Sequence, residues 1–211
     1  MTVRTGQEYI NGLRDEREVW YGGELVTDVT NFAELKPTIE SIAHLYDMQH
    51  NSKFAETLVV ESTTLGEPIG RAFEFVYEAQ QLEKKREAYM LWARSNCGML
   101  GRSPDFLNAM LTALAAKSGF FSEGGEDRAS AIVNYYEHVA RNDLFLTHAL
   151  LDPQLDKAKM RHQQDDPGIC LRVTEENSQG IVLNGVKRIA TVAPLADEIL
   201  VWPFPPTFQD G

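Results

Sequence analysis

The sequence predicts an α+β protein, with a helical domain over residues 1–150 and the first part of a β domain over residues 151–211. Through the first part, apolar residues recur at spacings of three and four, as on one face of a helix. After Pro153 the pattern changes to short strand-like runs between turn residues. These few strands cannot close a barrel, so we expect the β domain to be incomplete.

Capping and turn residues predict the first elements. Thr5-Gly6-Gln7-Glu8 has the capping-box pattern and indicates a short helix that ends near Asp15. A small hairpin is expected over residues 19–26, because its central Gly22-Gly23 tolerates positive φ. Pro37 in a first turn predicts a helix from Lys36 to Asp47.

Three longer helices should follow. The strongest pattern runs from Ile69 to Ser95, which at 1.5 Å per residue predicts a helix roughly 40 Å long. Ser103 as N-cap and Pro104 at the first position start the next helix, which ends at Gly119. A last helix is expected from about Gly125 to Leu151.

The β domain is predicted from short runs of branched residues. Strands are expected at residues 173–174, 181–183, 186–192 and 198–202, and Asn184-Gly185 indicates a tight turn between the second and the third. Either the gene is split or truncated, or a partner supplies the rest of this domain.

Composition excludes several classes of function. The 211 residues are 43% apolar and 24% charged, and 20 basic against 31 acidic side chains give a formal charge of −11. An acidic chain without a basic stripe is a poor match to nucleic acid or to an anionic membrane. The first residues lack the apolar core of a signal peptide, and two distant cysteines suit a reducing compartment. We therefore expect a cytoplasmic protein.

Known catalytic motifs are missing from the sequence. The five histidines never fall four residues apart, which argues against a metal site. No glycine-rich loop follows a predicted strand, and no nucleophile elbow occurs, so nucleotide-binding folds and acyl transfer are disfavoured.

Two side chains are candidates for chemistry. Arg102 precedes a helix N-terminus, whose dipole does not favour a cation, so an anionic ligand is one explanation and an ordinary solvated arginine is the other. His148 lies in the last turn of its predicted helix, outside the apolar stripe. Capping that helix is the simpler role for its imidazole.

Three segments in register carry a resemblance to a known family. They are Gly-Arg-Ser-Pro-Asp-aromatic at residues 101–106, His-Ala-x-x-x-Pro-Gln at residues 148–154, and the run from Glu175 through residues 180–187 to Thr191. In this order and spacing the chain resembles the 4-hydroxyphenylacetate 3-hydroxylase family, the oxygenase component of two-component flavin monooxygenases. The similarity spans essentially all 211 residues.

The resemblance implies an acyl-CoA-dehydrogenase-like architecture, of which this chain has the helical N-terminal domain and part of the β-barrel domain. The C-terminal helical bundle, which also forms tetramers, is absent. It further implies FAD, supplied as FADH2 by a separate flavin reductase, and O2 as co-substrate. The reaction would be ortho-hydroxylation of a phenol through a flavin C4a-hydroperoxide.

The site residues implied by the resemblance follow motif by motif. Arg102 and His148 would be catalytic, because a cation and an imidazole near the phenol oxygen stabilise its phenolate. The substrate would also contact Ser103, Phe106, Pro203 and Phe204. The flavin would contact His148, Gln154, Asp156, Lys157 and Thr191, and no metal is expected.

Two departures from the family pattern bear on the substrate. Phe106 stands where the family usually has tyrosine, and Pro203-Phe204 stands where small hydroxylated residues are common. We therefore expect a bulkier, more apolar phenol than 4-hydroxyphenylacetate.

Two alternatives stay open. The chain could be a non-catalytic remnant or half-enzyme that needs a partner chain. It could also be a relative of 4-hydroxybutyryl-CoA dehydratase, but that enzyme's iron–sulfur cluster requires cysteines near Arg102, and only Cys97 is there.

Overall fold

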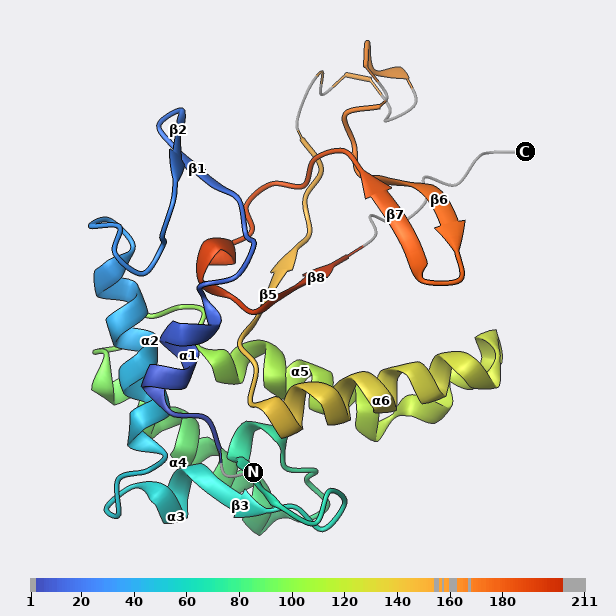
Figure 1. Cartoon of the computed structure of the whole chain (residues 1–211). Coiled ribbons are helices and arrows are strands. Elements are labelled where there is room, and N and C mark those ends of the chain that lie inside the picture. The colour runs from blue at the N-terminus through green and yellow to red at the C-terminus, as the bar shows by residue number, and fades with distance from the viewer. Residues whose placement is uncertain (1–2, 154–155, 157, 160–162, 167, 203–211) are drawn as a thin grey trace. The chain divides into compact units, whose positions relative to one another are not determined.

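A computed structural model of the chain describes residues 3–153, 156, 158–159, 163–166 and 168–202. The fold divides into two compact units. The helical unit comprises residues 1–146 and 194–198, and the β unit comprises residues 147–193 and 199–211. Helices and strands both occur, as the predicted α+β class requires (Figure 1).

The helical unit begins as local signals predict. Helix α1 (Gly6–Gly12) starts at a complete capping box, in which Glu8 N donates to Thr5 Oγ1 and Thr5 N donates to the Glu8 carboxylate. Gly6 is needed here because a Cβ would lie 2.4 Å from the carbonyl oxygen of Ala43. That residue belongs to helix α2 (Lys36–Met48), which packs beside α1 (Figure 1).

The hairpin predicted over residues 19–26 is confirmed. Strands β1 (Val19–Tyr21) and β2 (Glu24–Val26) pair in antiparallel register, with Val19 opposite Val26. Gly22 and Gly23 have φ values of 61° and 90°, the backbone that glycine allows without strain. Trp20 and Leu25 are exposed on this hairpin.

The predicted helix from Ile69 to Ser95 is wrong over its first ten residues. A short helix α3 (Ala55–Leu58) leads into strand β3 (Val59–Glu61), which pairs with β4 (Pro68–Gly70). A 3-10 turn η1 (Arg71–Phe73) follows, and Arg71 is buried with its guanidinium donating to the carbonyls of Glu56, Thr57 and Val59. Helix α4 (Ala79–Ser95) starts only where Gln81 Oε1 accepts from Glu78 N.

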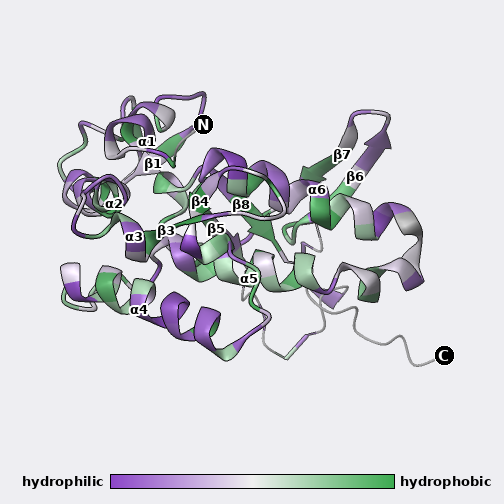
Figure 2. Cartoon of the chain, turned by 90° about the horizontal axis from the view of Figure 1, so that it is seen from below, coloured by the Kyte–Doolittle hydropathy of each residue, from purple (hydrophilic) through white to green (hydrophobic). Residues whose placement is uncertain are grey.

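Helix α4 contributes a narrow stripe to the core. Only Lys85, Ala88 and Trp92 of its residues are buried, and the rest of the helix is mainly hydrophilic (Figure 2). The apolar cluster around it joins residues from α2, α3 and α4: Leu45, Met48, Leu58, Ala88 and Trp92. A second, aromatic part of the core stacks Tyr9 on Tyr46, with ring centroids 5.4 Å apart.

Helix α5 (Pro104–Ala116) has Ser103 as its N-cap residue and Pro104 at its start, as predicted. It continues through a 3-10 segment η2 (Ser118–Gly124) into α6 (Glu126–Asn142). Helices α5 and α6 lie against each other in Figure 1.

The prediction that α6 continues to Leu151 is wrong. Asp143 adopts the left-handed conformation (φ 47°, ψ 48°), which ends the helix at Asn142. Strand β5 (Leu146–Ala149) follows and belongs to a two-stranded sheet with β8 (Glu198–Val201). His148 therefore lies on a strand and does not cap a helix.

In the β unit, strands β6 (Arg172–Asn177) and β7 (Gly180–Asn184) form an antiparallel hairpin, and every residue of both strands is exposed. The strand predicted over residues 186–192 is wrong. Val186 and Arg188 form only isolated bridges, because Ile189 and Val192 take φ values of 57° that no strand accommodates. Among the described residues, no sheet has more than two strands.

Residues 194–198 return to the helical unit and are held by polar contacts. Tyr9 Oη donates to Leu195 O at 2.8 Å, and Arg17 Nη1 donates to the carbonyls of Pro194 and Ala196. Arg4 Nη2 lies 2.9 Å from the carboxylate of Asp197. This segment is therefore part of the helical unit, although it follows the β unit in sequence.

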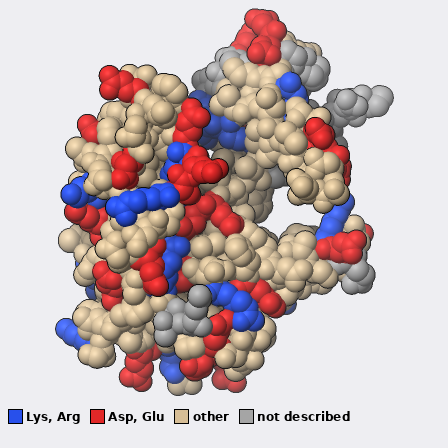
Figure 3. All heavy atoms as spheres, viewed as in Figure 1, with Lys and Arg blue, Asp and Glu red and all other residues tan. Residues whose placement is uncertain are grey.

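The surface mixes charges of both signs. On the face shown in Figure 3, basic side chains are scattered among acidic ones and form no continuous stripe. Over the part of the chain that the structure describes, no helix is long and apolar enough to cross a membrane.

Candidate functional site

The first part of the candidate site is the turn between α4 and α5. Helix α4 ends in a tight turn, in which Gly98 N donates to Ala93 O at 2.7 Å and both Cys97 and Gly98 have positive φ. Residues 101–103 then lead into α5, whose first turn includes Asp105 and Phe106.

The Arg102 side chain contacts two residues of its own motif, Gly101 and Phe106. Its Nη1 donates to Gly101 O at 3.0 Å, and its Cζ lies 4.6 Å from the centroid of the Phe106 ring. A guanidinium at this distance from an aromatic ring is attracted by the ring's negative face. Arg102 Nε is shielded from solvent and has no hydrogen-bond partner within the described chain.

Ser103 and Asp105 follow Arg102 in the sequence, and their side chains are hydrogen-bonded to each other. The Ser103 hydroxyl donates to Asp105 Oδ1, and it makes no cap bond to the helix backbone. Burial raises the pKa of the Asp105 carboxyl. Sequence reasoning gave Asp105 no role, since Ser-Pro-Asp at a helix start is typical of a solvated cap and only the fold shows its burial.

The second part of the candidate site lies in the β unit. His148 is half-buried on β5, next to Thr147, whose hydroxyl donates to Thr191 O at 2.6 Å. Thr147 is 1% exposed, whereas the side chain of Thr191 is exposed. This bond fixes the backbone of Thr191 beside β5. The sequence gave no signal for Thr147, because its partner lies 44 residues away.

The remaining predicted residues are divided between a loop and the undescribed part of the chain. Asp156 is exposed, and its Oδ1 accepts from Ala158 N at 2.9 Å within its own loop. Gln154, Lys157, Pro203 and Phe204 lie outside the described residues. Arg102, Ser103 and Phe106 thus form one group in the helical unit, whereas His148 and Thr191 both belong to the β unit, where Thr191 is bonded to Thr147, the neighbour of His148. That the two groups share one cleft stays a prediction.

Cysteines and metal ligands have no evident place in this arrangement. Cys97 is exposed and Cys170 is buried, and they belong to different units. The described residues contain no group of three or more His, Cys, Asp or Glu side chains arranged to hold a metal ion.

The arrangement has two parts: a helical unit that holds the Arg102 guanidinium over the Phe106 ring, and, later in sequence, a β unit in which Thr147 of β5 bonds to the backbone of Thr191. Residues 5–211 match the family model described as "4-hydroxyphenylacetate 3-hydroxylase N terminal". The chain belongs to this family.

Similarity to named proteins supports the family assignment. The chain is 39% identical to the oxygenase component of 4-hydroxyphenylacetate 3-monooxygenase from Thermus thermophilus, over 95% of this chain and 40% of the relative. A crystal structure of such an oxygenase component, complexed with FAD and 4-hydroxyphenylacetate, is similar with a TM-score of 0.86 and 40% identity, over 95% of this chain and 41% of that one. The chain spans about two fifths of the length of the curated relatives it matches.

A more distant structure shares the fold alone. An oxygen-tolerant archaeal 4-hydroxybutyryl-CoA dehydratase from N. maritimus is similar with a TM-score of 0.79 at 23% identity, over 96% of this chain and 40% of that one.

Proposed function

We propose that the chain is the N-terminal portion of the oxygenase component of a reduced-flavin-dependent aromatic hydroxylase. The observation that carries this proposal is the similarity, over 95% of the chain, to an oxygenase structure that binds FAD and a phenol. The finer architecture we propose is acyl-CoA-dehydrogenase-like, with the β unit as part of a barrel. The whole enzyme would act with a flavin reductase and form a tetramer in the cytoplasm.

We assign substrate binding to Arg102. A phenol has a pKa near 10, and a cation close to its oxygen lowers that value and stabilises the phenolate. The Phe106 ring holds the guanidinium in place before any ligand arrives, so little ordering is needed on binding. Ser103 lies beside Arg102, and its hydroxyl oxygen can still accept a hydrogen bond. Phe106 offers a phenol only an apolar edge.

The β-unit residues fit a flavin. His148 is half-buried, and Thr191 presents an exposed hydroxyl on a backbone that Thr147 fixes. We propose that these two residues hold FAD together with Asp156, and with Gln154 and Lys157 from outside the described residues. When bound, reduced FAD would activate O2. His148 would take the phenol proton, and a dry pocket would keep water from the reaction.

The exposed β6–β7 hairpin favours a second candidate function. In this alternative the chain is a portion of an enzyme that works only together with further polypeptide. Val173 pairs with Leu183, and Ile181 lies on the same face of β7 as Leu183, yet all three are exposed. A two-stranded hairpin with an uncovered apolar face is marginal in water. The dehydratase relationship stays disfavoured, because the sequence near Arg102 has Cys97 alone.

Anaerobic titration of the full chain with FADH2 tests the proposal. We expect weak, saturable binding that His148→Ala or Thr191→Val reduces, because both side chains would contact the flavin. Thr174→Val is the matched control, since Thr174 is exposed on β6 and its hydroxyl donates to Val182 O at 3.2 Å. Equal losses in all three variants would contradict the assigned flavin site. Binding that appears only after a partner chain is added would support the second candidate.

A further inference from the structure

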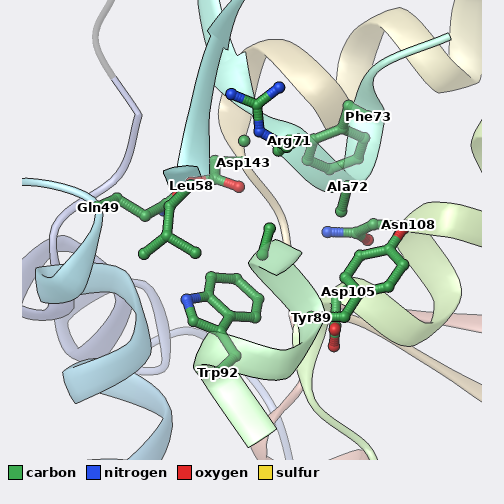
Figure 4. A pocket seen from close by; sticks show the side chains of 12 residues that line it. Gln49, Leu58, Arg71, Ala72, Phe73, Tyr89, Trp92, Asp105, Asn108 and Asp143 are labelled. Atoms are coloured by element: carbon green, nitrogen blue, oxygen red, sulfur yellow. The ribbon is translucent and has the colours of Figure 1, made fainter. Parts of the chain in front are cut away.

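A small cavity lies within the helical unit, and Asp105 of the Arg102 motif is among the residues that line it. Its walls come from the end of α2, from α3, from β4 and η1, from α4, from the first two turns of α5 and from Asp143 (Figure 4). Its volume is about 10 Å³, which is space for about one water molecule. It is therefore too small for a substrate or a cofactor.

The cavity gathers buried polar atoms that lack partners. Four side-chain atoms from its walls are shielded from solvent and make no hydrogen bond within the described chain: Gln49 Oε1, Tyr89 Oη, Trp92 Nε1 and Asn108 Oδ1. Native proteins leave few buried polar groups unsatisfied, so their concentration around one cavity requires an explanation.

Three of the four residues are well inside the protein, and Tyr89 is half-buried. Gln49 and Asn108 are each 2% exposed, and Trp92 is 7% exposed. Figure 4 shows the side chains of Trp92 and Asn108 directed toward the same space from α4 and α5. The Asp105 and Asp143 carboxyls line it as well.

The hydrogen-bonding groups that line the cavity determine which molecule can occupy it. Two amide oxygens accept hydrogen bonds, the indole N–H only donates, and the tyrosine hydroxyl does either. A metal cation would be repelled by the indole N–H, and an apolar molecule would satisfy none of the four atoms. Water both donates and accepts, so it can bond to either kind of atom, while the amide nitrogens of Gln49 and Asn108 already donate to Asp143 and to Leu144 O.

We propose that this cavity is a hydration site, occupied by a buried water molecule that bridges α4 to the start of α5. Asn108 also donates through Nδ2 to Leu144 O at 3.2 Å, so the same residue links the site to the segment that leads into β5. The water thereby supports the helix turn that carries Asp105, and through it the Arg102 motif. This inference does not depend on the proposed function.

The sign of one mutational effect tests the proposal. Tyr89→Phe removes a hydroxyl that has no protein partner. If water is bound there, the variant loses a hydrogen bond, and we expect the folding equilibrium constant to fall about 2- to 10-fold. If the cavity is dry, the variant loses only an unsatisfied group and becomes more stable.

A matched control and a direct readout complete the test. Tyr136→Phe should lower stability in either case, because Tyr136 Oη donates to Phe73 O at 2.7 Å. In the ¹⁵N-labelled full chain, we expect the Trp92 indole N–H to show an NOE to long-lived water. The Trp20 indole, which donates to Glu18 Oε1 at 2.6 Å, should not. A stability gain in Tyr89→Phe, or the absence of the Trp92–water NOE, would overturn the hydration site.

Discussion

The ion pair between Arg4 and Asp197 should be the most sensitive point of the helical unit. Arg4 Nη2 lies 2.9 and 3.2 Å from the two carboxylate oxygens, and Phe145 N donates to the same carboxylate at 2.7 Å. The two charged side chains are only 11% and 12% exposed. The pair is therefore largely shielded from solvent screening.

Asp197→Ala removes one member of this pair and leaves the Arg4 charge buried. Losing one partner of a buried pair costs about 3–5 kcal/mol. Arg4 would keep its contacts with the rings of Tyr9 and Tyr46, at 5.2 and 5.0 Å, so we expect a loss near 3 kcal/mol. Asp197→Asn keeps an acceptor for Phe145 N and should lose less, about 2 kcal/mol.

Urea unfolding followed by far-UV circular dichroism measures these losses, because the α-helices lie in the helical unit. Glu83→Gln is the control, since Glu83 pairs with Arg86 where both side chains are more than half exposed. Such a solvent-exposed pair contributes little to stability. A loss in Asp197→Ala no larger than in Glu83→Gln would refute the reasoning that burial makes this pair important.

Two further predictions concern titration and ligand binding. Burial lowers the pKa of Lys85 to about 8, so between pH 8 and the unfolded value of about 10.4 the unfolded chain binds more protons and stability should rise with pH. Lys85→Met should abolish that rise. The measurement is the urea midpoint of both proteins at about pH 7.5 and about pH 9.5, and an equal change of midpoint with pH in the two proteins would contradict the prediction. Phe106→Leu removes the ring beside Arg102 and should weaken phenol binding about 2- to 10-fold, whereas Phe106→Tyr keeps the ring and should not. Calorimetric titration of the chain with simple phenols checks this, and equal losses in both variants would argue against the ring's role.

Local signals in the sequence predicted the elements that depend on neighbouring residues. The Thr5–Glu8 capping box, the Gly22-Gly23 turn and the Pro104 helix start each act within four residues, and each is present in the structure. Pairing over longer distances was not predictable in this way. Ile69 fits a helical period, but it pairs with Val60 in a strand.

The candidate site was predictable in its residues and less so in its geometry. The 101–106 motif identified Arg102 and Phe106, but not that one stacks on the other. His148 was expected on a helix, because nothing in the local sequence shows that residues 146–149 belong to a sheet with residues 198–201. Asp143 was the missed signal, since aspartate is one of the few residues that tolerate the left-handed conformation.

The return of residues 194–198 has a consequence for how such proteins are dissected or recombined. A gene fragment cut near codon 147 would lack the pentapeptide that Arg4, Tyr9 and Arg17 hold. Those three donors would then face water or one another. A chimera that exchanges the intervening stretch between homologues must therefore carry both crossover points, before Thr147 and after Ala193, to keep the N-terminal half intact.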